Sequence, residues 1–463
     1  MGKDLCSKGE GFHLLKQLEG ILESDKLIDE VGFLHPTQFA ALNEETGNSL
    51  HPSVTCATTS SGDEDLCHSS TIFWKRDHKL AISTQALLPL YNAAKHAYMN
   101  AARQYGRVAN LASKTDEIFD GNSTNSFLVS EEVLEYEMMK HSKALLLLSC
   151  DFGSAWNSRF YYSHSPKFKA CELIFLVKWK HIIAKKQTLS LFMDELLLSA
   201  LILSYSPKAE HAWSHRCWVI KMIAVKYGNL QEIVGRDSEL VEQIAEKSKM
   251  NYRAWNHRCW LISYMKREQV LDELNKSRKW AELHVADNCC FHYRQRLMLS
   301  MLEHGSPKQS PNLCSDYMPG LHKLLKEELD WDEMLIKRYI GREALWIHRR
   351  FLSQCWIKHF VSDVQGVYCN SGDRDCSNPN TGVFMDGEMQ LVSSCLTIRD
   401  SVFEDCRAQA MLAVTYILWV SKQIPQHQGI IELQGRLRNF GDVKTLLNKF
   451  CPEKSLLWDG LLS

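Results

Sequence analysis

The sequence lacks the features that mark membrane spans, structural zinc sites and disulfide scaffolds. Apolar runs such as ALLLL at 144–148 are far too short to cross a bilayer, which takes about 20 residues. The 16 cysteines are too dilute in 463 residues for a disulfide framework, and no CxxC pair supplies the spacing of a zinc site. We therefore expect a reduced protein with no metal site in this chain.

The chain also has no excess of charge of either sign. Lys and Arg number 54 and Asp and Glu number 55, for a net charge of −1. A protein that binds nucleic acid by neutralising phosphates needs a basic excess or a basic face, so no nucleic-acid partner is expected. The segment MGKDLCSKGE lacks the apolar core of a signal peptide, and Cys6 breaks the myristoylation pattern. These absences predict a cytoplasmic protein.

What the sequence does contain is one short motif in five copies. SPKAEHAWSHRCW at 206–218 and SKMNYRAWNHRCW at 248–260 share Ala-Trp-x-His-Arg-Cys-Trp in the same register. In every copy an arginine follows an aromatic residue by three positions. The aromatic residues are Trp156, Trp213, Trp255, Phe291 and Trp346, and the arginines are Arg159, Arg216, Arg258, Arg294 and Arg349. We interpret the stretch RAQAMLAVTYILWVSKQI near the C-terminus as a worn sixth copy.

Each copy is predicted to lie near the start of a helix, after a first helix such as 189–205. Ser206 and Pro207 are typical of an N-cap and a first helical residue. Residues 84–105 and 130–148 have the pattern of amphipathic helices, and no alternating run predicts a strand. Together these patterns predict an all-α fold of stacked helical hairpins.

The motif residues are predicted to form the joints between hairpins. Trp213, Arg216 and Cys217 share one helix face. The tryptophan would fill the groove between hairpins, and the arginine would donate to carbonyl oxygens at a neighbouring helix end. A histidine precedes the arginine in three copies, at His215, His257 and His348. We interpret these as hydrogen-bonded core or interface histidines, with a role as general bases as the alternative.

The predicted organisation has two parts. Residues 1–129 form an N-terminal helical region with a disordered loop near 48–70, and residues 130–463 carry the hairpin repeats. Loop insertions are expected near 303–320 and 361–388, where Gly, Asn, Asp, Ser and Pro gather.

The Trp-x-x-Arg signature, with Ser-Pro-Lys before Trp213 and Asn-Tyr before Trp255, resembles the repeats of protein prenyltransferase α subunits. The resemblance covers residues 130–360. The His-Arg-Cys-Trp motif is most similar to that of the Rab-type geranylgeranyltransferase α subunit. The resemblance implies the α subunit of a third type of protein geranylgeranyltransferase. The resemblance further implies an α–α superhelix, in which the stacked hairpins form a crescent around a β subunit. That β subunit is expected to be the Rab-type one, and the chain is expected to be inactive without it.

The resemblance also implies a division of chemistry within the heterodimer. The β subunit would supply the isoprenoid pocket and the zinc that makes a thiolate of the acceptor cysteine, so this chain needs no cofactor, and Mg²⁺ dependence stays open. The family places a lysine five residues before the second tryptophan, which is Lys208 here. Its ammonium would stabilise the departing diphosphate of the geranylgeranyl donor. Asn251 and Tyr252 match a pair that lines the same mouth and orients lipid and acceptor.

Two residues depart from the family pattern, and they keep a second hypothesis open. Arg253 could replace a contact to the diphosphate, whereas Glu210 would repel it. Taken alone, Lys208 would be a solvated lysine at a helix start. The alternative to an enzyme subunit is therefore a non-catalytic αα-repeat adaptor or scaffold. Glu210 and the insertions favour the adaptor, while Lys208, Asn251 and Tyr252 favour the enzyme.

Overall fold

The computed structural model describes residues 2–45, 72–115, 123–159, 188–228, 230–303, 314–362, 379–396 and 404–423, with positions 452 and 455. The chain divides into two compact units, residues 1–257 and 258–463. This division falls inside helix α11 (Tyr252–Leu261), whereas the predicted boundary at 129/130 falls inside helix α4 (Ser123–Leu148). The predicted loop near 48–70 lies outside the described residues.

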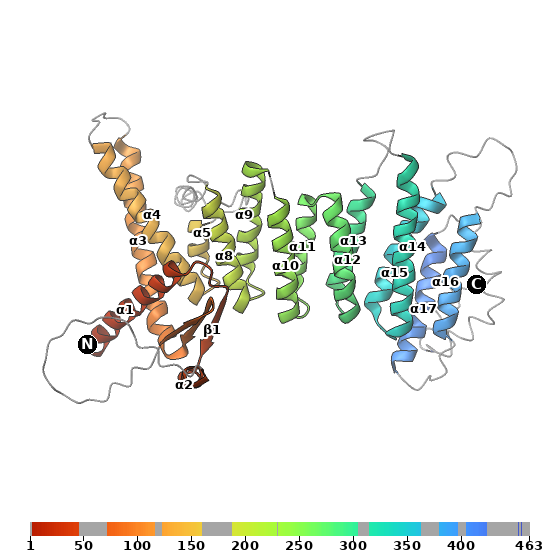
Figure 1. The fold of residues 1–463 in the computed structure, drawn as a ribbon, viewed down its shortest axis with the longest axis horizontal. Helices are drawn as coiled ribbons and strands as arrows, with labels where there is room; N and C mark the ends of the chain where they lie inside the picture. Colours follow the sequence, from red (N-terminus) through yellow and green to blue (C-terminus); the bar gives the residue numbers. More distant parts are fainter. Residues whose placement is uncertain are drawn as a thin grey trace. The chain divides into compact units, whose positions relative to one another are not determined.

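The first unit begins with helices and a small sheet (Figure 1). Its elements are α1 (Gly2–Ser24), β1 (Glu30–Leu34), α2 (Pro36–Glu45), β2 (Phe73–Arg76), β3 (Lys79–Ser83), the short 3-10 helix η1 (Thr84–Ala86) and α3 (Leu87–Thr115). The strand order is β1-β3-β2, with β1 parallel and β2 antiparallel to β3. The expectation that the chain contains no strand is therefore wrong.

The central strand lacks the alternation of apolar and polar residues by which a strand is usually recognised in a sequence. The central strand β3 is apolar without a break at Leu80, Ala81 and Ile82, and all three are buried. A strand paired on both edges and covered on its faces shows such a run instead of alternation. Asp77 and His78 form the tight β2–β3 turn, and both have positive φ. Such turns usually contain Asn-Gly, so the sequence here lacks the common signal of a hairpin.

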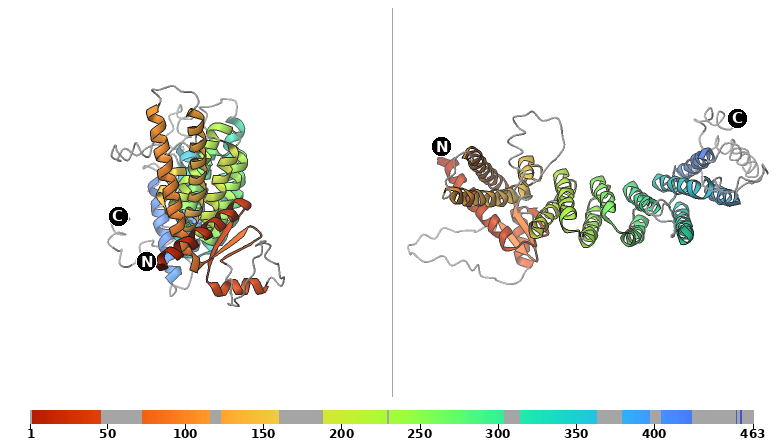
Figure 2. Two further views of the ribbon diagram at one scale, coloured as in Figure 1. Left: turned by 90° about the vertical axis from the view of Figure 1, so that its left-hand side faces the viewer. Right: turned by 90° about the horizontal axis from the view of Figure 1, so that it is seen from above.

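Helical hairpins make up the rest of the first unit (Figure 2). They are α4 with α5 (Gly153–Arg159), α8 (Leu189–Tyr205) with α9 (Glu210–Tyr227), and α10 (Gln231–Lys247) with the start of α11. The second unit continues with the 3-10 helix η2 (Ile262–Tyr264), α12 (Arg267–Leu283), α13 (Asn288–Glu303), α14 (Cys314–Arg338), α15 (Glu343–Trp356), the π-helical turn η4 (Ile357–Ser362), α16 (Pro379–Leu396) and α17 (Glu404–Gln423). The predicted all-α class of stacked αα-hairpins is confirmed, and the sheet is a small addition to it.

Several predicted helix boundaries are shifted. Ser206 ends α8, and Ala209 is the N-cap of α9, so the predicted cap at Ser206-Pro207 is wrong. Ser206 donates its backbone N–H to the carbonyl of Ile202, which continues the first helix by one bond. Helices α14 and α16 also begin inside the predicted insertions, at Cys314 and Pro379. Proline suits such a first position because its missing N–H has no helical partner there.

The hairpins share one local geometry that places the motif. In each of the five copies, the aromatic residue is the fourth residue of the second helix. Trp156, Trp213, Trp255 and Trp346 are all buried, with at most 5% of the residue exposed. The motif therefore lies in the hydrophobic core, where one hairpin packs on the next. No helix in the described ranges is both long enough and apolar enough to cross a bilayer.

Candidate functional site

The repeat arginine forms a buried ion pair with a carboxylate of the following hairpin. Arg159 at the end of α5 donates from Nε and Nη2 to the two oxygens of Glu195 on α8, at 3.1 and 2.9 Å. His215 on α9 lies 2.8 Å from the same carboxylate through Nε2. All three side chains are buried. One hairpin thus supplies the arginine, and the next supplies the carboxylate and the histidine.

This three-residue joint recurs along each unit. The other sets are Arg216–Asp237–His257, Arg258–Glu273–Tyr293, Arg294–Glu328–His348 and Arg349–Glu388–Tyr416. Tyrosine replaces histidine in two sets and donates its hydroxyl to the carboxylate. Tyr416 on α17 takes the histidine place in the last joint and is followed by Ile417 instead of an arginine. The sixth copy stays a prediction.

The arginines also bond backbone carbonyls, but not at helix ends as predicted. Arg159 donates from Nη1 to the carbonyl of Met139 at 2.7 Å, in the body of α4. The Ser142 hydroxyl donates to the same carbonyl and accepts from Arg159. Equivalent carbonyl bonds run from Arg216 to Leu196, from Arg294 to Leu274 and from Arg349 to Leu329. Each of these four guanidinium groups therefore connects its own first helix to the carboxylate of the next hairpin.

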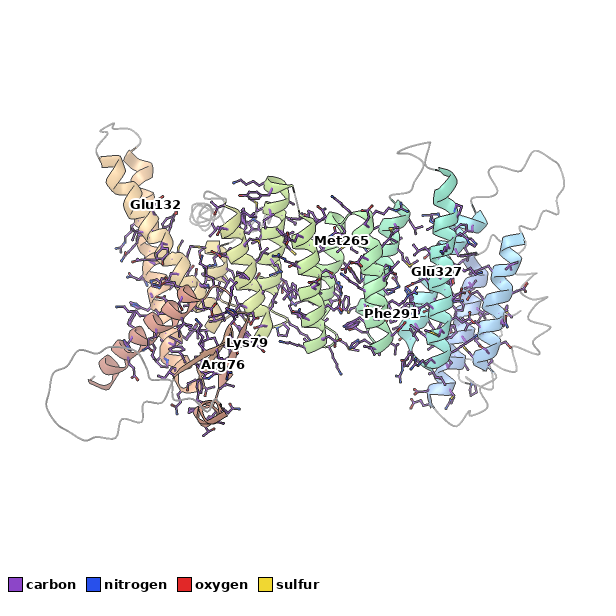
Figure 3. The ribbon with its side chains drawn as sticks, in the orientation of Figure 1. Arg76, Lys79, Glu132, Met265, Phe291 and Glu327 are labelled. Carbon is purple, nitrogen blue, oxygen red and sulfur yellow. The ribbon has the colours of Figure 1, made fainter. Side chains whose placement is uncertain are left out.

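The repeat aromatic residue packs on the histidine or tyrosine of the next joint. The ring centroids of Trp156 and His215 are 5.0 Å apart, as are those of Trp213 and His257. In the second unit Phe291 lies 5.3 Å from His348, and Trp346 lies 5.4 Å from Tyr416. Figure 3 marks Phe291 on α13. The aromatic residues thus act as the predicted joints and leave no ring face for a ligand.

The electrostatics of the joints are those of a structural network. Burial alone would raise the pKa of Glu195, but Arg159 and His215 lower it to about 2. Burial alone would also raise the pKa of Asp237, but Arg216 and His257 outweigh burial and lower it. These histidines hold charged carboxylates inside the core instead of facing solvent. The interpretation of His215 and His257 as core histidines is confirmed.

The joint carboxylates escaped the sequence analysis, although a signal exists. Each of Glu195, Asp237, Glu273 and Glu328 stands twenty positions before the histidine or tyrosine of its joint. Aligning the first helices in addition to the second ones would have aligned these acids. Their spacing is constant because the turns between paired helices are uniform in length.

A different set of residues gathers at the turn between α8 and α9. Lys208 lies in this turn and is exposed. The carbonyl of the preceding residue, Pro207, accepts two hydrogen bonds, from Trp213 Nε1 at 3.0 Å and from Asn251 Nδ2 at 2.8 Å. The second bond comes from the next hairpin. The lysine is therefore carried on a turn fixed by two hairpins.

Asn251 and Tyr252 have different surroundings in this structure. Asn251 is fully buried, and its Oδ1 accepts the backbone N–H of Ala254 at 3.2 Å to cap α11. Its amide is thus used on both sides, so Asn251 positions the turn instead of presenting itself to a ligand. Tyr252 is 68% exposed beside it and is free to meet a partner molecule. Met250 before them has a φ of 51°, in the left-handed region.

The two residues that depart from the family pattern form one ion pair. Arg253 Nη1 lies 2.7 Å from Glu210 Oε2, and both side chains are well exposed. The hydrogen bond from Arg253 lowers the pKa of Glu210. The two charges neutralise each other across adjacent hairpins, and the expected effects of Arg253 and Glu210 on an anion stay predictions.

Lys208 is a charged residue in the α8–α9 turn that hairpin packing does not require. Among the described residues it has no ion-pair partner. The equivalent positions in the other turns hold Asp151, Met250, Ala286 and Gly341, so hairpin packing requires no lysine here. The described residues also contain no group of three or more His, Cys, Asp or Glu side chains able to hold a metal. An exposed ammonium on a fixed turn can bind an anionic group supplied by a partner.

Comparison with known proteins agrees with this geometry. The family model described as the protein prenyltransferase alpha subunit repeat matches residues 192–223, 237–265 and 270–301. These ranges coincide with the hairpins α8–α9, α10–α11 and α12–α13.

Curated relatives carry the same repeats. Protein prenyltransferase alpha subunit repeat-containing protein 1 of Homo sapiens is 30% identical over 256 residues, which cover 47% of this chain and 58% of that protein. Its Danio rerio counterpart is 25% identical over 284 residues, which cover 54% of this chain and 61% of that protein. The match thus spans little more than half the length of these relatives. The chain therefore carries protein prenyltransferase alpha subunit repeats between residues 192 and 301 and is similar to these repeat-containing relatives over about half of its length.

Proposed function

We propose that this chain is the α subunit of a cytoplasmic protein geranylgeranyltransferase. It binds a zinc-containing β subunit, with the Rab-type subunit as the expected partner, and forms a heterodimer that is active only as a pair. The reaction transfers a geranylgeranyl group from its diphosphate to a cysteine thiolate of an acceptor protein. The observation that carries the proposal is Lys208, an exposed ammonium on a turn held by Trp213 and Asn251.

The role of Lys208 follows from where charge develops. As the carbon–oxygen bond of the donor breaks, negative charge grows on the diphosphate, and an ammonium fixed nearby stabilises it. A fixed turn matters because a preorganised donor needs no rearrangement during the reaction. Asn251 contributes by holding the Pro207 carbonyl, and Tyr252 supplies an exposed aromatic ring for the lipid or the acceptor.

The second candidate is an αα-repeat adaptor without a part in the chemistry. The ion pair between Glu210 and Arg253 favours it, because the pair cancels the charge of an arginine that could have met the diphosphate. Under this alternative the chain still holds a partner, but Lys208 is a solvated surface residue.

Co-purification with a prenyltransferase β subunit tests the assembly on which both the enzyme and the adaptor proposals depend. We expect the chain to purify as a stable pair with a prenyltransferase β subunit and to bury well over ~1,600 Å², the size of a standard interface. A chain that stays monomeric with every β subunit offered would contradict both the enzyme and its assembly. A pair that forms and transfers lipid with Lys208 removed would leave only the adaptor.

A further inference from the structure

A cavity in the first unit lies away from the Lys208 turn. Helices α1, α4 and α8 enclose about 440 Å³, within the ~300–1,000 Å³ range of small-molecule pockets. Helix α8 lines it from Leu191 to Leu201, whereas Lys208 follows the C-terminal end of that helix. The repeat joint Arg159–Glu195 forms part of its wall. The cavity is therefore a separate feature of the N-terminal half of the chain.

The cavity wall is largely apolar. Its apolar side chains are Leu22, Ile28, Met139, Leu191, Leu197, Leu198 and Leu201. The cavity opens to the surface beside two large hydrophobic residues of the wall, Tyr136 at 59% exposed and Leu197 at 36% exposed. An aliphatic chain laid along this wall would remove apolar surface from water.

The carboxylates of the wall already have cationic partners. These pairs are Glu19 and Glu23 with Lys140, Asp25 with Lys75, Asp194 with Lys26 and Glu195 with Arg159. The ammonium of Lys143 differs from the other wall cations. Among the described residues its polar contact is the carbonyl of Leu22 at 3.4 Å, and no carboxylate is paired with it. Lys143 is thus a half-buried ammonium without a carboxylate in direct contact in the part of the chain described, while Asp194 and Glu195 act on it from farther away.

The surroundings of Lys143 make that charge costly. Burial lowers the pKa of Lys143, and the nearby Arg159 guanidinium lowers it further, which together outweigh the opposite effects of Asp194 and Glu195. An anion bound beside the ammonium would offset both effects, because an opposite charge at short range favours the charged form. The wall carboxylates Asp194 and Glu23 limit how much negative charge the site accepts.

We propose that this cavity binds a monoanionic amphipathic molecule, an aliphatic chain with a carboxylate head, whose head lies on Lys143 and whose chain lies along the α8 leucines. One ammonium without a direct ion-pair partner matches one carboxylate. A diphosphate would bring more negative charge than the acidic wall tolerates. This site is independent of the proposed transferase activity and needs no β subunit.

Calorimetric titration of the full chain tests the proposal with dodecanoate, dodecanol and farnesyl diphosphate as probes. Dodecanoate should bind, and dodecanol should bind about 10–100-fold more weakly because it lacks the charge. Farnesyl diphosphate should also bind more weakly than dodecanoate. Equal binding of the alcohol and the acid would overturn the role of the ammonium, and tighter binding of the diphosphate would overturn the carboxylate head. No binding of dodecanoate would overturn the site.

Two variants and one control place the ligand in the cavity. Lys143→Met should weaken dodecanoate binding about 10–100-fold without lowering the melting temperature, since it removes a desolvated charge. Leu197→Glu at the exposed rim should also weaken binding, by adding a negative charge at the entrance. Lys95→Met, at an exposed lysine of α3, should bind as the wild type does. Wild-type affinity in both cavity variants would show that the acid binds elsewhere.

Discussion

Arg159 and Glu195 form a bidentate ion pair, at 3.1 and 2.9 Å, that joins the first hairpin to the second inside the core. Neither charge has access to water, so each depends on the other for compensation. Four similar pairs occur in the described part of the chain, each between an arginine and an acid of the following hairpin. These pairs determine how one hairpin is oriented on the next.

Breaking such a joint should destabilise the fold strongly. Glu195→Gln should lower the free energy of unfolding by ~3–5 kcal/mol, because it leaves the Arg159 charge buried without its partner. Denaturant titration measures this change. Glu232→Gln is the matched control, since its pair with Arg236 is exposed and should leave stability unchanged. Equal effects of the two substitutions would contradict a structural role for the buried pair.

The repeat tryptophan should be equally important for stability. Trp255 is 1% exposed, and Trp255→Ala should cost roughly 3–5 kcal/mol, the usual effect of truncating a large buried aromatic residue. It should also weaken β-subunit binding by loosening the adjacent hairpins. Leu283→Ala, at a residue that is 78% exposed, serves as the control. An unchanged melting temperature in the tryptophan variant would place that ring outside the core.

Acid should weaken the joints in a predictable range. The pKa of Glu195 is about 2 in the folded chain, below its ordinary value of 4.5, because Arg159 and His215 outweigh the effect of burial. A lowered folded pKa stabilises the fold above the unfolded value, and this contribution is lost as pH falls from about 4.5 toward 2. The loss has a slope of up to ~1.4 kcal/mol per pH unit. Denaturant titrations between pH 7 and 3 should show a shallower slope in Glu195→Gln than in the wild type.

Asp332 breaks the pattern of the other joints and predicts a stabilising substitution. It lies seventeen positions before Arg349, where Ser142, Ser199 and Ser277 precede their own arginines. Both carboxyl oxygens are buried and without a hydrogen-bond partner among the described residues, and burial raises the pKa of Asp332 well above its usual value. Arg349 Nη1 lies 3.7 Å from one of these oxygens, but burial outweighs its effect. A raised folded pKa costs stability once the pH rises above the unfolded value, because the unfolded chain releases this proton more readily than the folded chain.

Asp332→Ser should raise the free energy of unfolding at pH 7 by ~1–3 kcal/mol, because it removes an unsatisfied carboxyl group and restores the hydroxyl of the other joints. The gain should shrink as pH falls toward 4, where the unfolded chain also protonates this group. Thermal unfolding at both pH values measures it. Ser277→Asp should have the opposite effect at the same joint position. A destabilised Asp332→Ser variant at pH 7 would mean that this carboxyl is charged and paired with Arg349.

The sequence was sufficient to predict the hairpins and the aromatic residue and arginine of each joint, because both depend on local periodicity. Trp213 and Arg216 repeat at a fixed offset, and their burial follows from the helix face that they share. The acids Glu195 and Asp237 were missed because they belong to a different helix from the motif. The N-cap at Ala209 was missed because the backbone N–H of Ser206 bonds to α8 and extends that helix. No residue preference in the sequence predicts this bond.

The site was less accessible from sequence than the fold. Lys208 could be located by its offset from Trp213, but the bond from Asn251 to Pro207 joins two hairpins and depends on how they pack. The pairing of Glu210 with Arg253 has the same origin. Taken one at a time, these two residues suggested opposite effects on an anion, whereas the structure shows one neutral pair.

The most direct test of the proposed function is the single-turnover rate of geranylgeranyl transfer by the reconstituted pair of this chain and a β subunit. Lys208→Ala should leave the pair assembled and lower the rate by ~10²–10³, the size expected for removing one charge-stabilising donor from a preorganised site. Lys208→Arg should recover part of the rate because it keeps the charge, and Tyr252→Phe should cost less than the loss of the ammonium. Full activity in Lys208→Ala, with the pair intact, would contradict a catalytic role for this chain and leave it as the adaptor.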